Sequence, residues 1–185
     1  MQNTLEFYNK MTKDKVLDKK IKCFSCNAEI PDIESDVHRY MDSSPGCWHL
    51  FEQILEKEYA DTQYWKNHRI TVDAYAVQHY GKPSPRATQS VNLHLASLFL
   101  IYEKGYDLTI AYRGLTTLAN YKSELFWLDP PKNVGNITVA DIIKAQSAKE
   151  HGNLVYEWGN SVWNTWSNHH HTIKEFVEGH IKEIY

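Results

Sequence analysis

Several features that define whole classes of proteins are scarce or absent in this sequence. The chain has 185 residues but only three cysteines, an odd number that suits thiol or metal chemistry in a reducing compartment better than a disulfide framework. No apolar run approaches the roughly 18 residues of a membrane span. The first residues also lack the charged-then-apolar layout of a secretory signal. We therefore expect a cytoplasmic protein without a membrane segment.

A strong charge bias and the common catalytic loops are missing as well. The 20 basic residues nearly balance the 23 acidic ones, so overall charge does not favour nucleic acid as a partner. The sequence contains no glycine-rich phosphate loop, no G-x-S-x-G elbow and no dinucleotide fingerprint. Lys82 and Arg86 lie beside a predicted helix N-terminus that could bind an anion, although such a segment is usually only the start of a helix.

The residues that are present predict mostly helices. Cap, proline and glycine signals indicate five of them: from Pro45 to about Tyr59, from Thr71 to Gly81, from Pro85 to Gly105, from Thr138 to Gly152, and from about Leu154 nearly to the C-terminus. Ser44, Thr71 and Ser84 are the expected caps, and Thr138 with Asp141 resembles a capping box. The first helix is expected to have one apolar face, made of Trp48, Phe51, Leu55 and Tyr59.

These helices predict a mainly α fold of the helical-bundle type. Residues 21–40 alternate poorly, so they leave room for a short hairpin at most. We expect a single domain over residues 1–185, in which a zinc knuckle of about residues 20–48 packs on a helical body of about residues 49–185.

The cysteines predict a structural zinc site. Cys23 and Cys26 form a C-x2-C pair, and Cys47 follows 21 residues later. Zinc prefers four tetrahedral sulfur and nitrogen ligands, so a histidine is expected to join the three thiolates. His49 is two residues beyond Cys47 on the same helix, where side chains diverge. We therefore favour His38 as the fourth ligand and Zn²⁺ as the cofactor.

Two other interpretations of the cysteines remain open. Cys47 lies in the first turn of its predicted helix, where the helix dipole favours a thiolate. Such a thiolate suits a metal ligand, but it also suits a reactive nucleophile assisted by His49 or His38. The three cysteines could also be buried and inert, because free cysteine is often buried.

The cysteines belong to an ordered series of motifs: CFSC at 23–26, HRYM at 38–41, SPGCW at 44–48, DAYAVQH at 73–79, HL at 94–95 and SVWNTWSNHH at 161–170. This series resembles an uncharacterised bacterial family of unknown function, over roughly residues 23–176. The chain departs from the family pattern at Ser25, where glycine is usual, and at Tyr80, where proline is usual. The resemblance supports His38 as a ligand and a role for the later histidines, and it implies no activity.

The histidines suggest a second site on the helical body. Of ten histidines, His79, His94 and either His169 or His170 lie on predicted inner faces of three helices. Three converging imidazoles could hold an ion with an open position, and Asp73 or Gln78 could orient a ligand or bind substrate. The candidate catalytic residues are therefore Asp73, His79, His94 and His170. Each histidine also has an ordinary explanation as a hydrogen-bonded core residue, and Asp73 as a first-turn acid.

Three classes of function follow from these sites. We favour a zinc-stabilised binding or interaction module, whose partner would be an unknown small molecule or protein. The alternative is a metal-dependent hydrolase or transferase that uses the histidine cluster. A thiol enzyme acting through Cys47 is the third possibility.

Overall fold

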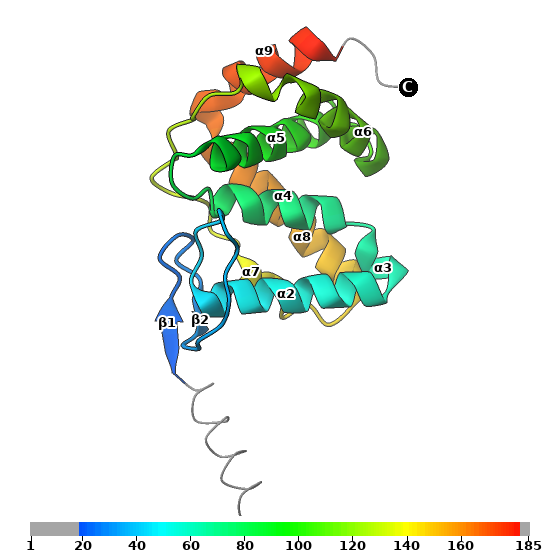
Figure 1. Ribbon diagram of the computed structural model, residues 1–185. Helices are drawn as coiled ribbons and strands as arrows, with labels where there is room; N and C mark the ends of the chain where they lie inside the picture. The colour runs from blue at the N-terminus through cyan, green and yellow to red at the C-terminus, as the bar shows by residue number, and fades with distance from the viewer. Residues whose placement is uncertain (1–18, 182–185) are drawn as a thin grey trace, which may run out of the picture.

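The computed structural model describes residues 19–181 and is mainly helical (Figure 1). Within this range the chain forms eight α-helices, two 3-10 helices and one two-stranded antiparallel sheet. In chain order they are β1 Lys20–Lys22, β2 Glu29–Pro31, α2 Pro45–Ala60, α3 Thr62–Trp65, α4 His68–Gln78, α5 Pro85–Tyr102, α6 Leu108–Leu118, η1 Ala119–Glu124, α7 Val139–Ile142, α8 Ala148–Thr165, η2 Ser167–His169 and α9 His170–His180. The expected mainly α fold and the short hairpin are confirmed. Among the described residues no helix is long and apolar enough to span a membrane.

Helix α4 lies at the centre of the arrangement, between α2 on one side and α5 on the other (Figure 1). It packs against α5 and α8, while α5 also contacts α6, α8 and α9. The hairpin lies at the N-terminal end of α2, and β2 packs against that helix. The cysteine-bearing segment is therefore attached to one end of the bundle.

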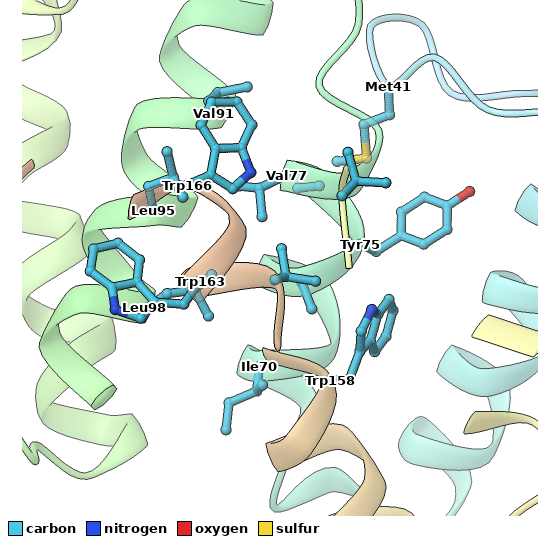
Figure 2. Close-up of a cluster of buried hydrophobic side chains, with 14 of the residues drawn as sticks. Met41, Ile70, Tyr75, Val77, Val91, Leu95, Leu98, Trp158, Trp163 and Trp166 are labelled. Atoms are coloured by element: carbon cyan, nitrogen blue, oxygen red, sulfur yellow. The ribbon is translucent and has the colours of Figure 1, made fainter. Parts of the chain in front are cut away.

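The core is built around large aromatic side chains from the C-terminal third of the chain. Trp158, Trp163 and Trp166 are at most 1 % exposed, and they meet apolar residues of α4 and α5 (Figure 2). The residues that surround them include Ile70, Tyr75, Val77, Val91, Leu95 and Leu98. Because tryptophan has the largest apolar side chain, these three residues bury a large area between the C-terminal part of the chain and helices α4 and α5.

Two of the expected helix starts are confirmed by their hydrogen bonds. The Ser84 hydroxyl accepts a bond from the Ala87 amide at 3.2 Å, and α5 follows from Pro85. Thr138 and Asp141 form the expected capping box at the start of α7. That helix ends at Ile142 rather than at Gly152, and Ser147 then caps a separate helix by accepting a bond from the Glu150 amide at 3.2 Å.

The C-terminal part also differs from the prediction of one long helix. Helix α8 ends at Thr165, where Trp166 leaves helical backbone geometry, and α9 begins only at His170. Helix α6 was not predicted at all. Its start is nevertheless encoded by Asp107, whose carboxylate accepts bonds from the amides of Thr109 and Ile110 at 2.8 and 2.9 Å.

The buried face of α2 differs from the one that periodicity suggested. Phe51 is buried as expected, but Tyr59 is 67 % exposed. The buried positions are instead Gly46, Cys47, Phe51, Ile54 and Glu58. The face is rotated because Glu58 has polar partners inside the bundle, which an apolar pattern does not show.

Two glycines allow the chain to pass close to itself near the cysteines. A Cβ atom on Gly46 would lie 2.0 Å from the carbonyl oxygen of Pro31, at the end of the hairpin. Gly81 has a φ of +72°, and a Cβ atom there would lie 2.2 Å from the carbonyl oxygen of Tyr40. Both contacts are with backbone, so a side chain at either position must displace main chain.

We predict that Gly46→Ala destabilises the fold because its new methyl group collides with the hairpin backbone. The expected loss in free energy of unfolding is about 2 kcal/mol, the usual range for overpacking. Chemical denaturation measures it. Gly179→Ala is the matched control, because no atom lies within 4 Å of a Cβ at that position in α9. Equal stability of the two variants would contradict the close approach.

Candidate metal centre

The C-x2-C pair lies in a tight turn between the two strands. The Asn27 amide donates to the Cys23 carbonyl at 2.9 Å, and the Cys23 amide donates to the Ala28 carbonyl at 2.9 Å. Asn27 has a φ of 60°, a left-handed geometry that asparagine tolerates better than most residues. The turn thereby brings Cys23 and Cys26 into one group of side chains.

This turn is bonded to the segment that leads into α2. The Phe24 amide donates to the Ser44 hydroxyl at 3.2 Å, and the Ser25 hydroxyl donates to the Asp42 carbonyl. Ser44 was expected to cap α2, but its side chain makes no cap hydrogen bond. Its hydroxyl serves the cysteine turn instead, which places Cys47, in the first turn of α2, beside the other two thiols.

The three cysteines meet one histidine, and that histidine is His79. The Sγ atoms of Cys23, Cys26 and Cys47 and Nε2 of His79 all lie within 4.8 Å of one another. The Sγ atoms of Cys26 and Cys47 are 3.7 Å apart, and His79 Nε2 lies 3.7 Å from Cys23 Sγ and 3.3 Å from Cys47 Sγ. In a tetrahedron with zinc–ligand bonds of about 2.3 Å to sulfur and about 2.0 Å to nitrogen, the ligand atoms are about 3.5–3.8 Å apart. The observed distances are close to those of a tetrahedral site.

His79 is oriented by the end of α4. Its Nδ1 lies 2.8 Å from the Tyr75 carbonyl, which can only accept a hydrogen bond, so the ring proton is assigned to Nδ1. The Nε2 lone pair is then directed to the thiols. The ring stacks on Tyr75 with centroids 4.0 Å apart, and Phe51 stacks on the same tyrosine at 3.8 Å. The imidazole is therefore held by both a hydrogen bond and an aromatic stack.

The three thiols strongly influence one another's ionisation. Hydrogen bonds from Cys26 and Cys47 lower the pKa of Cys23 far below its ordinary value. A hydrogen bond to Cys23 raises the pKa of Cys26 to about 12, and hydrogen bonds to Cys23 and Cys26 raise the pKa of Cys47 as well. Without a cation, ionisation of one thiol therefore disfavours ionisation of the other two, because all three are buried close together. A bound divalent cation would allow all three to ionise together.

His38, the expected fourth ligand, lies outside this group. Its ring packs edge-on against Tyr40 with centroids 4.3 Å apart, and it contacts Trp48 at 5.3 Å. Burial lowers the pKa of His38, and the charges of Arg39 and His94 act in the same direction. The expectation was wrong because it assumed a ligand between Cys26 and Cys47 in sequence, whereas the end of α4 is closer in space.

The geometry also bears on the two other interpretations of Cys47. His49 is half-buried, lies 3.1 Å from Gln53 of the same helix, and does not join the group. Cys47 is 0 % exposed, so a substrate would not reach its sulfur in this conformation. Three inert, unrelated cysteines do not describe the site either, because the three sulfurs converge with a histidine nitrogen.

The other histidines do not form the second metal site. Within residues 19–181, the Cys3His group is the only cluster of His, Cys, Asp or Glu with the spacing of a metal site. His170 stacks on Trp163 at 3.7 Å and its Nε2 lies 2.9 Å from the Trp163 carbonyl. His169 Nε2 lies 2.8 Å from the Asp129 carbonyl. The expected convergence of His79, His94 and His170 is wrong, because the helices that carry them direct the three rings to different neighbours.

Gln78, considered as a ligand-orienting residue, is a buried structural link. Its amide nitrogen donates to the carbonyls of Val134 and Ile137, both at 2.9 Å. Its carbonyl accepts a bond from the Trp158 indole at 3.0 Å. The side chain thereby joins α4 to α8 and to the loop before α7.

Comparison with known proteins identifies the family of the chain. A model of the family of unknown function DUF5946 matches residues 21–167, well over half of the chain. The chain belongs to this family. The match confirms the expected membership of an uncharacterised family, and its range contains all four residues of the Cys3His group. Neither a search of the curated proteins nor a search of the solved structures returned a match.

In this DUF5946 member, Asp73 and His94 belong to a second, polar network. Asp73 was expected in the first turn of a helix, but α4 starts at His68, so Asp73 lies mid-helix and is 0 % exposed. Its carboxylate accepts bonds from Arg69 Nε at 3.0 Å and from the Ser97 hydroxyl at 2.6 Å, and lies 2.7 Å from His94 Nδ1. Burial alone would raise the pKa of Asp73, but the Arg69 charge and the His94 hydrogen bond outweigh it and lower it.

A third network, around Glu58, was not foreseen from the sequence. Glu58 of α2 is 0 % exposed, and its carboxylate lies 2.8 Å from His68 Nδ1 and 2.9 Å from His151 Nε2. Thr71, expected as a helix cap, instead lies inside α4 and donates its hydroxyl to the same carboxylate at 2.5 Å. These bonds join α2, α4 and α8. The one sequence feature that could have indicated this network is a glutamate on an otherwise apolar face of α2.

We predict that Glu58→Gln destabilises the protein at neutral pH by about 3 kcal/mol, because it removes the charge from a buried, bonded cluster. Burial tends to raise the Glu58 pKa, but the hydrogen bonds from His151, His68 and Thr71 lower it below 4.5. A carboxyl group whose pKa is lowered by folding stabilises the folded state at pH values above its unfolded-state pKa. This stabilisation is lost as the pH falls through the folded-state pKa.

The difference between wild type and Glu58→Gln should therefore shrink as pH falls below about 4.5, the ordinary glutamate value. Urea denaturation over a pH series measures the difference, and common acid effects at the other sites cancel in it. Glu56→Gln on the exposed side of α2 is the control, for which we expect less than about 0.5 kcal/mol. A pH-independent difference would count against a charged Glu58.

Proposed function

We propose that this protein binds one zinc ion through Cys23, Cys26, Cys47 and His79, and that the ion is structural. The observation that carries the proposal is the convergence of four buried donor atoms within 4.8 Å of one another. They come from the hairpin turn, the start of α2 and the end of α4. Unrelated buried cysteines have no reason to meet an oriented imidazole nitrogen.

The donor set favours zinc among the common metals. Three thiolates and one imidazole are soft and borderline ligands, which suit zinc and do not suit magnesium or calcium. Four protein donors fill a tetrahedral shell and leave no position for a substrate or a reactive water. Cys23, Cys47 and His79 are each 0 % exposed, and Cys26 is 3 % exposed. These features support a structural rather than a catalytic ion.

The role of the ion would be to attach a segment that has little core of its own. Each strand of the hairpin has three residues, too few for independent stability. Metal binding would link the hairpin to α2 and α4 and contribute directly to the free energy of folding. The remainder of the protein would then act as a binding or interaction module for a small molecule or another protein.

The test of this site is the metal content of protein purified without chelators. We expect about one zinc ion per chain in the wild type, measured by plasma mass spectrometry. Cys47→Ser should lose most of the metal, and His79→Asn should weaken its retention against a chromogenic chelator, because each variant removes a donor atom. His38→Asn is the matched control and should retain zinc as the wild type does. Zinc loss in His38→Asn with full retention in His79→Asn would overturn the ligand set.

Thiol labelling separates the zinc site from a thiol enzyme. In metal-loaded protein we expect slow iodoacetamide labelling of all three cysteines, since zinc and burial both shield the sulfurs. Chelation should raise the labelling rate of all three together, as followed by intact-mass spectrometry. Rapid labelling of Cys47 alone in metal-loaded protein would favour the thiol enzyme and contradict full ligation.

A further inference from the structure

A surface pocket lies beside the Asp73–His94 network, and none of the four residues of the Cys3His group lines it. It has a volume of about 400 Å³, within the usual range for small-molecule sites. Tyr40 from the segment before α2, Arg86, Ser90 and His94 from α5, and Leu115 from α6 line it. The pocket therefore combines apolar walls with a small number of polar groups.

The polar groups are arranged along one face of α5. Arg86, Ser90 and His94 are spaced by four residues, which places them on the same side of an α-helix. Arg86 is exposed, whereas Ser90 and His94 are partly buried. A ligand would thus meet a guanidinium at the outer end of this row and an imidazole at the inner end.

His94 is oriented by groups behind it. Asp73 Oδ1, which can only accept, lies 2.7 Å from His94 Nδ1, and Arg69 Nη2, which can only donate, lies 2.9 Å from the same nitrogen. We assign the proton to Nδ1 because the contact with Asp73 is the shorter one and Arg69 already donates to the Asp73 carboxylate through both Nε and Nη2. Among the described residues none makes a hydrogen bond to His94 Nε2, so this nitrogen can accept a hydrogen bond from a ligand in the pocket. The side chain of His94 is 16 % exposed.

Two further features specify the ligand. The Ser90 hydroxyl is buried without a hydrogen-bond partner among the described residues, although buried hydroxyls are nearly always bonded. Arg86 is the charged residue in the lining, and no carboxylate residue belongs to it. The pocket therefore offers a cation, a hydroxyl and a hydrogen-bond acceptor.

We propose that this pocket binds a small organic anion that carries a hydroxyl group. The anionic group, a carboxylate or a phosphate, pairs with Arg86, and the ligand hydroxyl donates to His94 Nε2 and bonds to Ser90 Oγ. Asp73, Arg69 and Ser97 act as positioning residues that hold the imidazole in the accepting tautomer. This site shares no residue with the Cys3His group, and its ligand defines the chemical class that the protein recognises.

Calorimetric titration of the metal-loaded protein tests the proposal, with glycerol 3-phosphate and glycerate as probes. We expect saturable binding of at least one of them, and the stronger binder identifies phosphate or carboxylate as the anionic group. Propyl phosphate and propionate lack the hydroxyl and should bind roughly tenfold more weakly than their counterparts. The Cε1–H resonance of His94, assigned from a His94→Asn spectrum, should shift on binding.

Substitutions distinguish this pocket from general anion attraction. Arg86→Gln and His94→Asn should each weaken binding roughly tenfold or more. Arg39→Gln is the matched control, because Arg39 lines the neighbouring hollow rather than this one, and it should bind as the wild type does. Gln89 also lines the pocket but makes no bond in the Asp73 network, so Gln89→Trp should fill the pocket and abolish binding in a folded protein even if His94→Asn fails to fold.

Three results would overturn the proposal. One is the absence of saturable binding for both hydroxylated probes. Another is an equal loss of affinity in Arg39→Gln and Arg86→Gln, and the third is undiminished binding in folded Gln89→Trp. Zinc content is measured on the same samples. If the protein retains zinc but fails these binding tests, the anion-pocket proposal is wrong and the zinc-site proposal is unaffected.

Discussion

The convergence of three cysteine sulfurs on the imidazole of His79 is the interaction on which the N-terminal part of the structure depends. Cys23 and His79 are 56 residues apart, yet their ligand atoms lie 3.7 Å from each other. The hydrogen bonds of Phe24 and Ser25 to Ser44 and Asp42 hold the cysteine turn beside the start of α2, where Cys47 lies. The hairpin is too short to be stable alone, so its position follows from this site and from the packing of β2, with its buried Ile30, against α2.

Buried polar groups organise the helical body in a comparable way. Glu58 joins α2 to α4 and α8, and Asp73 joins α4 to α5, each through bonds that outweigh the cost of burial. Such networks are costly when incomplete, so they favour one arrangement of helices over similar alternatives. The Asp73 network also borders a pocket, and it therefore has a part in presenting His94 as well as in packing.

Prediction from sequence succeeded where the signal was local. The C-x2-C turn, the Ser84 cap and the Thr138 capping box each depend on residues within a few positions of one another. Ser44 shows the limit of local prediction, because its hydroxyl accepts a hydrogen bond from the Phe24 amide instead of capping α2. Glu58 shows another, because an apolar pattern cannot reveal a charged residue whose partners are on two other helices.

The sequence by itself determined that the protein is mainly helical, and its cysteine spacing predicted that the three cysteines form one group with a histidine. Only the tertiary structure decided which histidine it is, and it separated His79, His94 and His170 into three unrelated surroundings. The physical reason is that hydrogen bonds within a turn or a helix follow from chain spacing. Contacts between elements depend instead on how α4 packs between α2, α5 and α8, which no local pattern encodes.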